Sequence, residues 1–74
     1  MKVLLFGLIA EKANATELLS SAGTMHALKQ ELEARIPELE KLTYALAVDR
    51  VIVKEDRILN GNEEIALLPP FAGG

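Results

Sequence analysis

The chain has 74 residues, half of them hydrophobic, with no cysteine and a formal net charge of −3. At this length folding buries only about 60% of the surface of the unfolded chain, so we expect one domain stabilised by a rich apolar core. The composition excludes a disulfide or a thiolate metal site, and it argues against nucleic acid as a partner, because phosphate binding needs clustered lysine and arginine.

The amino-terminal part of the sequence predicts two strands. Residues 2–9 are apolar and rich in leucine without alternation, which is typical of a strand covered on both faces. The run is about half the length needed to cross a bilayer, and no convincing signal-peptide cleavage site follows it, so we expect a cytoplasmic protein that binds no membrane. Residues 10–15 predict a turn or loop, and residues 16–20 alternate weakly, as expected of a second strand antiparallel to the first.

A helix is predicted after the break at residues 20–23. Thr24 is a good N-cap residue, and Pro37 ends the helix because its ring disfavours the helical conformation of the residue before it. The apolar residues between them are spaced by three, four and four, which places them on one stripe of a helix: Met25, Leu28, Leu32 and Ile36. Residues 37–42 can form a short second helical turn.

The second half of the chain predicts two or three more strands, at residues 44–48, 51–53 and 65–68. Asp49-Arg50 is a plausible reversal, residues 54–57 are a solvated charge run, and Asn60-Gly61-Asn62 is a turn signal. Strands on both sides of a single main helix predict an α+β fold, with the helix laid across a mostly antiparallel or mixed sheet.

The last six residues, 69–74, predict an extended tail. Pro69 and Pro70 each fix φ near −65°, which favours extended geometry. Gly73 and Gly74 carry no Cβ, so this backbone can thread a narrow cleft. An exposed Phe71 side chain would be unfavourable in water, whereas in a groove of a partner it would contribute much of the binding energy.

Three segments carry a resemblance to a known family: M-K-V-L-L-F-G at the start, T-M-H-A-L-K-Q-E-L in the helix and I-A-L-L-P-P-F-A-G-G at the end. The chain resembles the small sulfur-carrier proteins of the ubiquitin-like β-grasp fold, and among them the small subunit of molybdopterin synthase. The resemblance covers essentially the whole chain. It implies a β-grasp domain over residues 1–68, with a mixed sheet of four to five strands packed on one main helix, and a Pro-Pro-x-x-Gly-Gly tail over residues 69–74.

The resemblance also implies a function. An E1-like enzyme would use ATP to adenylate Gly74, and sulfur would replace AMP to give a thiocarboxylate. The large subunit of molybdopterin synthase would then take the terminus into its active site, where the sulfur builds the dithiolene of molybdopterin. The chain itself would be a non-catalytic donor that binds no cofactor and no metal. The absence of cysteine fits, because an internal thiol could attack the activated terminus.

The resemblance assigns roles to particular residues. Gly74 would carry the sulfur. The partner-binding positions would be Phe6, Ile52, Leu68, Pro69, Pro70, Phe71, Ala72 and Gly73. On the apolar pattern alone Phe6 is expected in the core, whereas Leu68 and Ile52 fit the core and an interface equally well. We expect a heteromeric complex with the large subunit dimerised at its centre and one copy of this chain at each end.

Other functions fit the same sequence. A sulfur carrier for another pathway, such as the thiazole of thiamine, would share the diglycine but usually lacks the Pro-Pro. A ubiquitin-like modifier would end with Gly74 in an isopeptide bond to a lysine. In a plain β-grasp interaction domain the tail would do nothing, and Gly73-Gly74 would be a frayed end.

Overall fold

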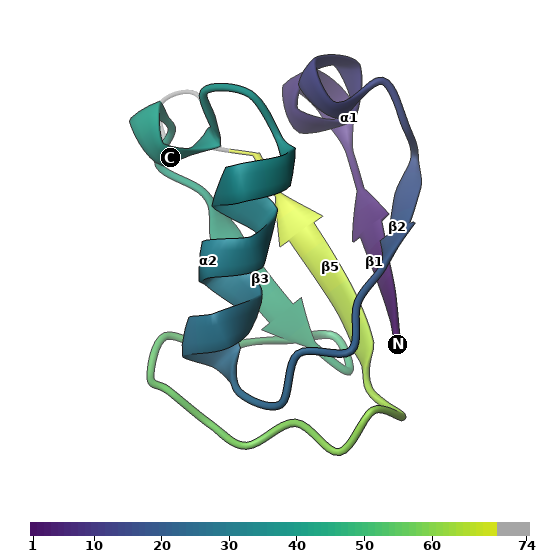
Figure 1. The fold of residues 1–74 in the computed structure, drawn as a ribbon, viewed down its shortest axis with the longest axis vertical. Coiled ribbons are helices and arrows are strands. Elements are labelled where there is room, and N and C mark those ends of the chain that lie inside the picture. Colours follow the sequence, from purple (N-terminus) through teal and green to yellow (C-terminus); the bar gives the residue numbers. More distant parts are fainter. Residues whose placement is uncertain (70–74) are drawn as a thin grey trace.

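The computed structural model describes residues 1–69, which form a five-stranded mixed sheet, two α-helices and a short 3₁₀ helix (Figure 1). The elements in chain order are β1 (Lys2–Leu5), α1 (Gly7–Ala13), β2 (Glu17–Leu19), α2 (Met25–Arg35), η1 (Leu39–Lys41), β3 (Ala45–Val48), β4 (Val51–Ile52) and β5 (Glu64–Leu68). The predicted α+β class, with one main helix across a mixed sheet, is confirmed.

The sheet has the strand order β2-β1-β5-β3-β4, so the last strand of the chain lies in the middle. β1 and β5 are parallel, with Leu5 opposite Leu67, whereas the other neighbours are antiparallel. Parallel strands end at the same edge of a sheet. The chain therefore leaves β5 beside the point where it leaves β1.

Helix α2 forms where the sequence predicts it. The hydroxyl of Thr24 accepts a hydrogen bond from the backbone N–H of Ala27 at 3.1 Å, which satisfies one donor that a helix amino terminus leaves unpaired. At the other end Ile36 has extended backbone and its N–H bonds to the carbonyl of Leu32, directly before Pro37. The predicted apolar stripe is buried against the sheet.

The prediction of one strand over residues 2–9 and a loop over residues 10–15 is wrong. β1 ends at Leu5, and the next residues form α1. Gly7 turns the chain with a φ of 54°, and Ile9 then lies fully buried at the end of the core. Asn14 ends the helix in the left-handed conformation that favours asparagine. A short apolar run cannot by itself distinguish a buried strand from a strand followed by a buried helical turn.

The reversals in the second half lie where the sequence predicts them. Asp49 and Arg50 have φ values of 50° and 73°, and positive φ at both central residues is typical of a type I′ hairpin turn. Before β5 the carboxylate of Glu63 accepts hydrogen bonds from the backbone N–H groups of Asn60 and Gly61. The second helical turn is shorter than the predicted residues 37–42 and is the 3₁₀ helix η1.

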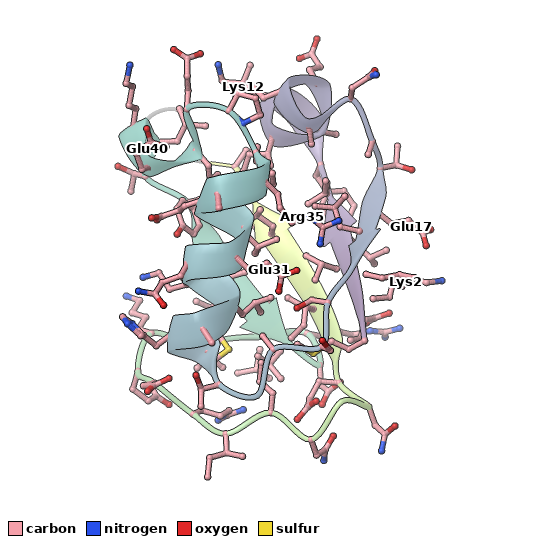
Figure 2. All side chains as sticks on the ribbon, viewed as in Figure 1. Lys2, Lys12, Glu17, Glu31, Arg35 and Glu40 are labelled. Atoms are coloured by element: carbon pink, nitrogen blue, oxygen red, sulfur yellow. The ribbon has the colours of Figure 1, made fainter. Side chains whose placement is uncertain are left out.

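Side chains from α2 also hold the edge strand β2. Arg35 donates from Nη1 to the carbonyl oxygen of Leu19 and to Glu31, both at 2.8 Å, and Figure 2 shows it extending from α2 toward β2. The other oxygen of Glu31 accepts from the hydroxyl of Ser20 at 2.6 Å. The bond from Arg35 occupies the carbonyl oxygen of Leu19 at the end of β2, an edge strand whose backbone could otherwise pair with another chain.

The core lies between α2 and one face of the sheet. From the three central strands it receives the alternate residues Val3, Leu5, Leu46, Val48, Ile65 and Leu67, each at most 4% exposed. We call the opposite side of the sheet, turned away from α2, the outer face. Among residues 1–69 no helix is both long and apolar enough to span a membrane.

Candidate functional site

The candidate site is the carboxyl end of β5, where the tail begins. Leu68 pairs with Ala45 of β3, and the preceding Leu67 pairs with both Leu5 and Leu46. The strand is thus held by neighbours on both sides almost to its last residue. Pro69 follows at once and is half-buried. The position from which residues 70–74 continue is therefore fixed by the centre of the sheet.

Gly7 and Pro69 meet at this edge. A Cβ atom added at Gly7 would lie 3.5 Å from Cγ of Pro69, so the proline ring lies close against the glycine backbone. The φ of 54° at Gly7 is also a conformation that larger side chains adopt at a cost. A glycine at this position therefore allows the chain to turn from β1 into α1, and it leaves room for the ring of Pro69.

An apolar band crosses the outer face next to this edge. The register places Leu4 of β1, Ala66 of β5, Ala47 of β3 and Ile52 of β4 in one row. Ile52 at one end of the row is 49% exposed, whereas Ala47 in its middle is only 5% exposed. Leu68 lies on the same face. This band, which we call the outer apolar band, has the chemistry of a surface that packs against another protein.

The structure places each described residue of the predicted site. Leu68 and Ile52 lie on the outer face, Leu68 half-buried and Ile52 exposed. Phe6 is 45% exposed and is the residue directly before α1, so the expectation from the apolar pattern that it lies in the core is wrong. Since Gly7 contacts Pro69, Phe6 and Pro69 lie at the same edge of the sheet. The remaining predicted positions, which lie outside the described residues, are Pro70, Phe71, Ala72, Gly73 and Gly74.

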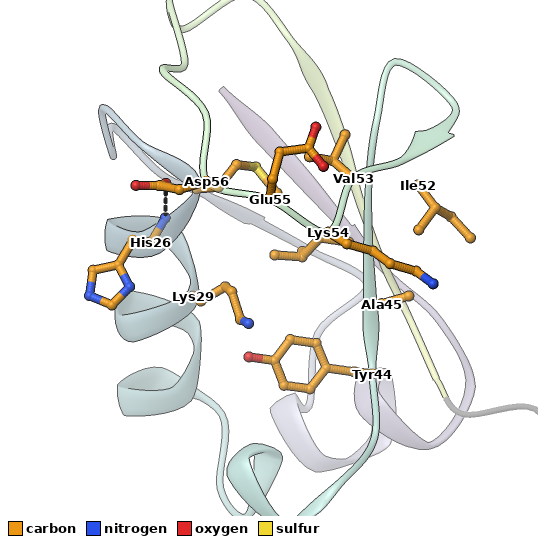
Figure 3. A pocket seen from close by; sticks show the side chains of 11 residues that line it. His26, Lys29, Tyr44, Ala45, Ile52, Val53, Lys54, Glu55 and Asp56 are labelled. Atoms are coloured by element: carbon orange, nitrogen blue, oxygen red, sulfur yellow. Dashed lines mark hydrogen bonds between the residues drawn. The ribbon is translucent and has the colours of Figure 1, made fainter.

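A pocket of about 410 Å³ opens between α2 and the β3–β4 side of the sheet (Figure 3). It is lined by Met25, His26, Lys29, Tyr44, Ala45, Leu46, Ile52, Val53, Lys54, Glu55 and Asp56. Two of these residues, Ala45 and Ile52, also lie on the outer face, so the pocket adjoins the outer apolar band. Sequence reasoning missed this pocket, because its walls come from three separate segments and no single segment carries a motif.

Tyr44 forms a fixed wall of the pocket. Its hydroxyl donates to Oε2 of Glu33 at 2.6 Å, and the ammonium of Lys29 lies 5.8 Å from the centre of its ring. Burial raises the pKa of the Tyr44 hydroxyl well above its ordinary value, and the hydrogen bond to Glu33 adds to the shift. Tyr44 therefore stays neutral at physiological pH. Within residues 1–69 no group of three or more His, Asp or Glu is placed to hold a metal ion.

Comparison with known proteins agrees with this architecture. The model of the ThiS family matches residues 3–74 of the chain. The crystal structure of SAMP1 from Haloferax volcanii superimposes with a TM-score of 0.77 at 20% sequence identity, covering 100% of this chain and 98% of that one. The arrangement of a mixed sheet on one main helix is thus the ubiquitin-like β-grasp fold. The match over nearly the whole length shows that the chain belongs to the ThiS family of ubiquitin-like β-grasp sulfur carriers.

Proposed function

We propose that the chain is the small, sulfur-donating subunit of molybdopterin synthase, with Gly74 as the carrier of the sulfur. Small carriers of this family are generally non-catalytic, and they generally act with E1-like activating enzymes and with sulfur-accepting enzymes. The proposal gives this chain those two kinds of partner and identifies the sulfur acceptor as the large synthase subunit.

The observation that carries the proposal is the position of β5. A central strand, held on both sides, ends in Pro69 at a sheet edge that also presents the exposed Phe6. The sequence that follows is Pro-Phe-Ala-Gly-Gly, and the family model matches through Gly74. A segment that starts from a rigid base and ends in two residues without side chains suits insertion into the active site of another protein.

The chemistry at Gly74 would proceed in two steps. A carboxylate is a poor electrophile, so the activating enzyme would use ATP to form an acyl-adenylate, with release of pyrophosphate. A hydrosulfide ion would then attack the carbonyl carbon, the bond to the AMP oxygen would break with release of AMP, and a thiocarboxylate would remain. ATP is bound and consumed by the activating enzyme in this scheme, and this chain binds no cofactor of its own.

The choice of the molybdopterin pathway depends on Pro69-Pro70. Carriers that resemble this chain but serve the thiazole of thiamine usually lack the proline pair. The second candidate function is therefore a sulfur carrier for another pathway, such as the synthesis of the thiazole of thiamine. The match to the ThiS family model supports this candidate. Both candidates use the same activation of Gly74 and differ in the enzyme that accepts the sulfur.

The pathway is tested by giving the thiocarboxylated chain to the large subunit of molybdopterin synthase together with cyclic pyranopterin monophosphate. We expect molybdopterin to form and the chain to return to its carboxylate mass. The matched control is a chain with one alanine appended after Gly74, which we expect to be inactive. A thiocarboxylated chain that keeps its sulfur in this mixture would contradict the pathway and leave the carrier activity standing.

The same preparation separates a carrier from a protein modifier. A ubiquitin-like modifier would form isopeptide bonds to lysine and give a ladder of conjugates in a denaturing gel. A sulfur carrier would give no ladder and a single thiolated species. If the chain is a plain interaction domain, the appended alanine should make no difference to the result of either assay.

We also propose a stable complex with the large subunit, formed through the outer apolar band and the tail. Ile52 and Phe6, which are 49% and 45% exposed, would be buried in this complex. Co-elution of the two proteins at micromolar concentration in size-exclusion chromatography is the expected result. Separate elution would contradict the complex.

A further inference from the structure

The pocket beside Tyr44 differs from the rest of the surface in its charges. In the described part of the chain six of the eight lysine and arginine side chains have a carboxylate oxygen within 4.0 Å: Lys2, Lys12, Arg35, Lys41, Arg50 and Arg57. Lys29 and Lys54 have no such carboxylate partner among residues 1–69, and both line this pocket. The two lysine side chains that have no carboxylate partner in the described part of the chain thus line the same pocket, with Lys29 on the α2 side and Lys54 extending toward Ile52 (Figure 3).

The carboxylates around the pocket have other partners. Oδ1 of Asp56 accepts hydrogen bonds from the backbone N–H groups of His26 and Arg57, both at 2.9 Å, which caps the start of α2. Glu55 lies 4.0 Å from the guanidinium of Arg57. Figure 3 shows the carboxylate of Glu55 on the far side of the pocket from Tyr44, whereas Lys29 is directed toward the Tyr44 ring. Glu33, which does not line the pocket, accepts a hydrogen bond from the hydroxyl of Tyr44.

The pocket also lies close to the carboxyl end of β5. Its wall residue Ala45 is the direct partner of Leu68 across the ladder between β3 and β5. Adjacent strands are about 4.8 Å apart, so a protein that covers Leu68 reaches the edge of the pocket without further extension. Ile52, which joins the pocket to the outer apolar band, is 49% exposed.

We infer that this pocket receives an aspartate or glutamate side chain of the protein that holds the tail, paired with the ammonium group of Lys29 or of Lys54. Its apolar walls, Ile52 and the ring of Tyr44, would surround the stem of that side chain and exclude water from the ion pair, which strengthens it. The first partner to bind at the pocket would be the E1-like activating enzyme, because every reaction proposed for Gly74 begins with adenylation by this enzyme. This inference rests on the proposed activation of Gly74.

The test measures the affinity of the chain for the E1-like activating enzyme as the KCl concentration is raised. The double variant K29Q/K54Q removes both pocket charges. The matched control K2Q/K41Q removes two lysines that already pair with Glu17 and Glu38, at 3.7 and 3.8 Å, so the net charge changes equally. We expect the pocket variant to bind about tenfold more weakly and to lose most of the salt dependence, while the control keeps both.

A second readout identifies the contact directly. Carbodiimide joins an amine to a carboxylate only where the two are in contact, so the cross-linked complex should yield peptides that link Lys29 or Lys54 to an acidic residue of the enzyme. Equal weakening by the two double variants would overturn the inference, as would cross-links confined to Lys2 and Lys41. Thermal unfolding of both variants checks that the exposed substitutions leave the fold intact.

The two proposals can fail separately. If the wild-type chain neither binds the activating enzyme nor gains sulfur, the proposed function itself is contradicted. If the wild-type chain is thiolated and K29Q/K54Q binds and reacts as well as wild type, only the assignment of the pocket is overturned.

Discussion

The two faces of the sheet are built by the same strands and differ in what covers them. Leu67 points toward α2 and is fully buried, whereas its neighbour Leu68 points to the outer face and is half-buried. On the core face large aliphatic side chains fill the space below the helix. On the outer face the apolar band has small alanine side chains at its centre and Ile52, half exposed, at one end. The comparison indicates that one face supplies the stability of the domain and leaves the other available to a partner.

Truncating one leucine on each face is expected to give the largest difference. Leu67→Ala removes a fully buried side chain and should lower the free energy of unfolding by about 3 kcal/mol, because a cavity remains in the core. Leu68→Ala, one residue later, should cost about 1 kcal/mol, because its side chain is only partly buried. Urea denaturation measures both values.

If Leu67→Ala does not fold, the milder Ile65→Val on the same face should still cost about 1 kcal/mol. Equal losses for Leu67→Ala and Leu68→Ala would show that the two faces contribute alike. The comparison of faces would then be wrong.

The edge where the tail begins should also be sensitive to substitution. Gly7→Val places a β-branched residue at a φ of 54° and a side chain against Pro69, so we expect a loss of about 2 kcal/mol. Gly23→Ala is the matched control, since nothing lies within 4 Å of the added Cβ, and its effect should stay within about 0.5 kcal/mol. Thermal or urea unfolding of the two variants gives the comparison. If Gly7→Val left the free energy of unfolding unchanged, the result would mean that this edge tolerates a shift of Pro69, where the tail begins.

A smaller effect is expected where α2 begins. Thr24→Ala removes the hydroxyl that accepts from Ala27 and should cost about 1 kcal/mol. Ser21→Ala is the control, because the hydroxyl of Ser21 makes no hydrogen bond within residues 1–69, and it should be nearly neutral. Amide hydrogen exchange at Ala27 should rise in the first variant alone. Equal exchange in both variants would count against the cap.

The smallest expected effect is a pH dependence before β5. The hydrogen bond from the Asn60 backbone is the main reason that the pKa of Glu63 lies below its ordinary value of 4.5, and the bond from Gly61 adds to it. A carboxyl whose pKa is lowered by folding stabilises the fold above its unfolded pKa. That contribution is lost as the pH falls through the folded value.

Urea midpoints should therefore decrease as the pH is lowered from about 5 to 3. Glu63→Gln should flatten part of this decrease, whereas Glu40→Gln should not, because Glu40 is exposed and makes no hydrogen bond or ion pair in the described part of the chain. Identical pH profiles for the two variants would contradict the role of the Glu63 turn.

The local signals in the sequence predicted most of the fold. Helix α2 has a cap residue, an apolar stripe and a proline stop, each within a few residues of the structure it specifies. The hairpin at Asp49-Arg50 and the turn at Asn60–Asn62 are equally local. Helix α1 was missed because its apolar residues continue the pattern of β1, and the change at Gly7 depends on how the end of the core is filled.

The candidate site was predicted unevenly for the same reason. Pro69-Pro70 and the diglycine Gly73-Gly74 lie within six consecutive residues, so the start of a tail could be inferred without a structure. The exposure of Phe6 and the position of Ile52 depend on which sheet face α2 covers. The pocket around Lys29, Tyr44 and Lys54 depends on segments brought together only by folding.

We propose that β5 presents a tail whose terminal carboxylate is converted to a thiocarboxylate. The most direct test is the intact mass of the untagged chain after incubation with an E1-like activating enzyme, ATP and a sulfide source. We predict a mass gain equal to the exchange of one oxygen for sulfur, confined to the last peptide. An unchanged mass, beside a control carrier that is converted in the same mixture, would contradict the claim.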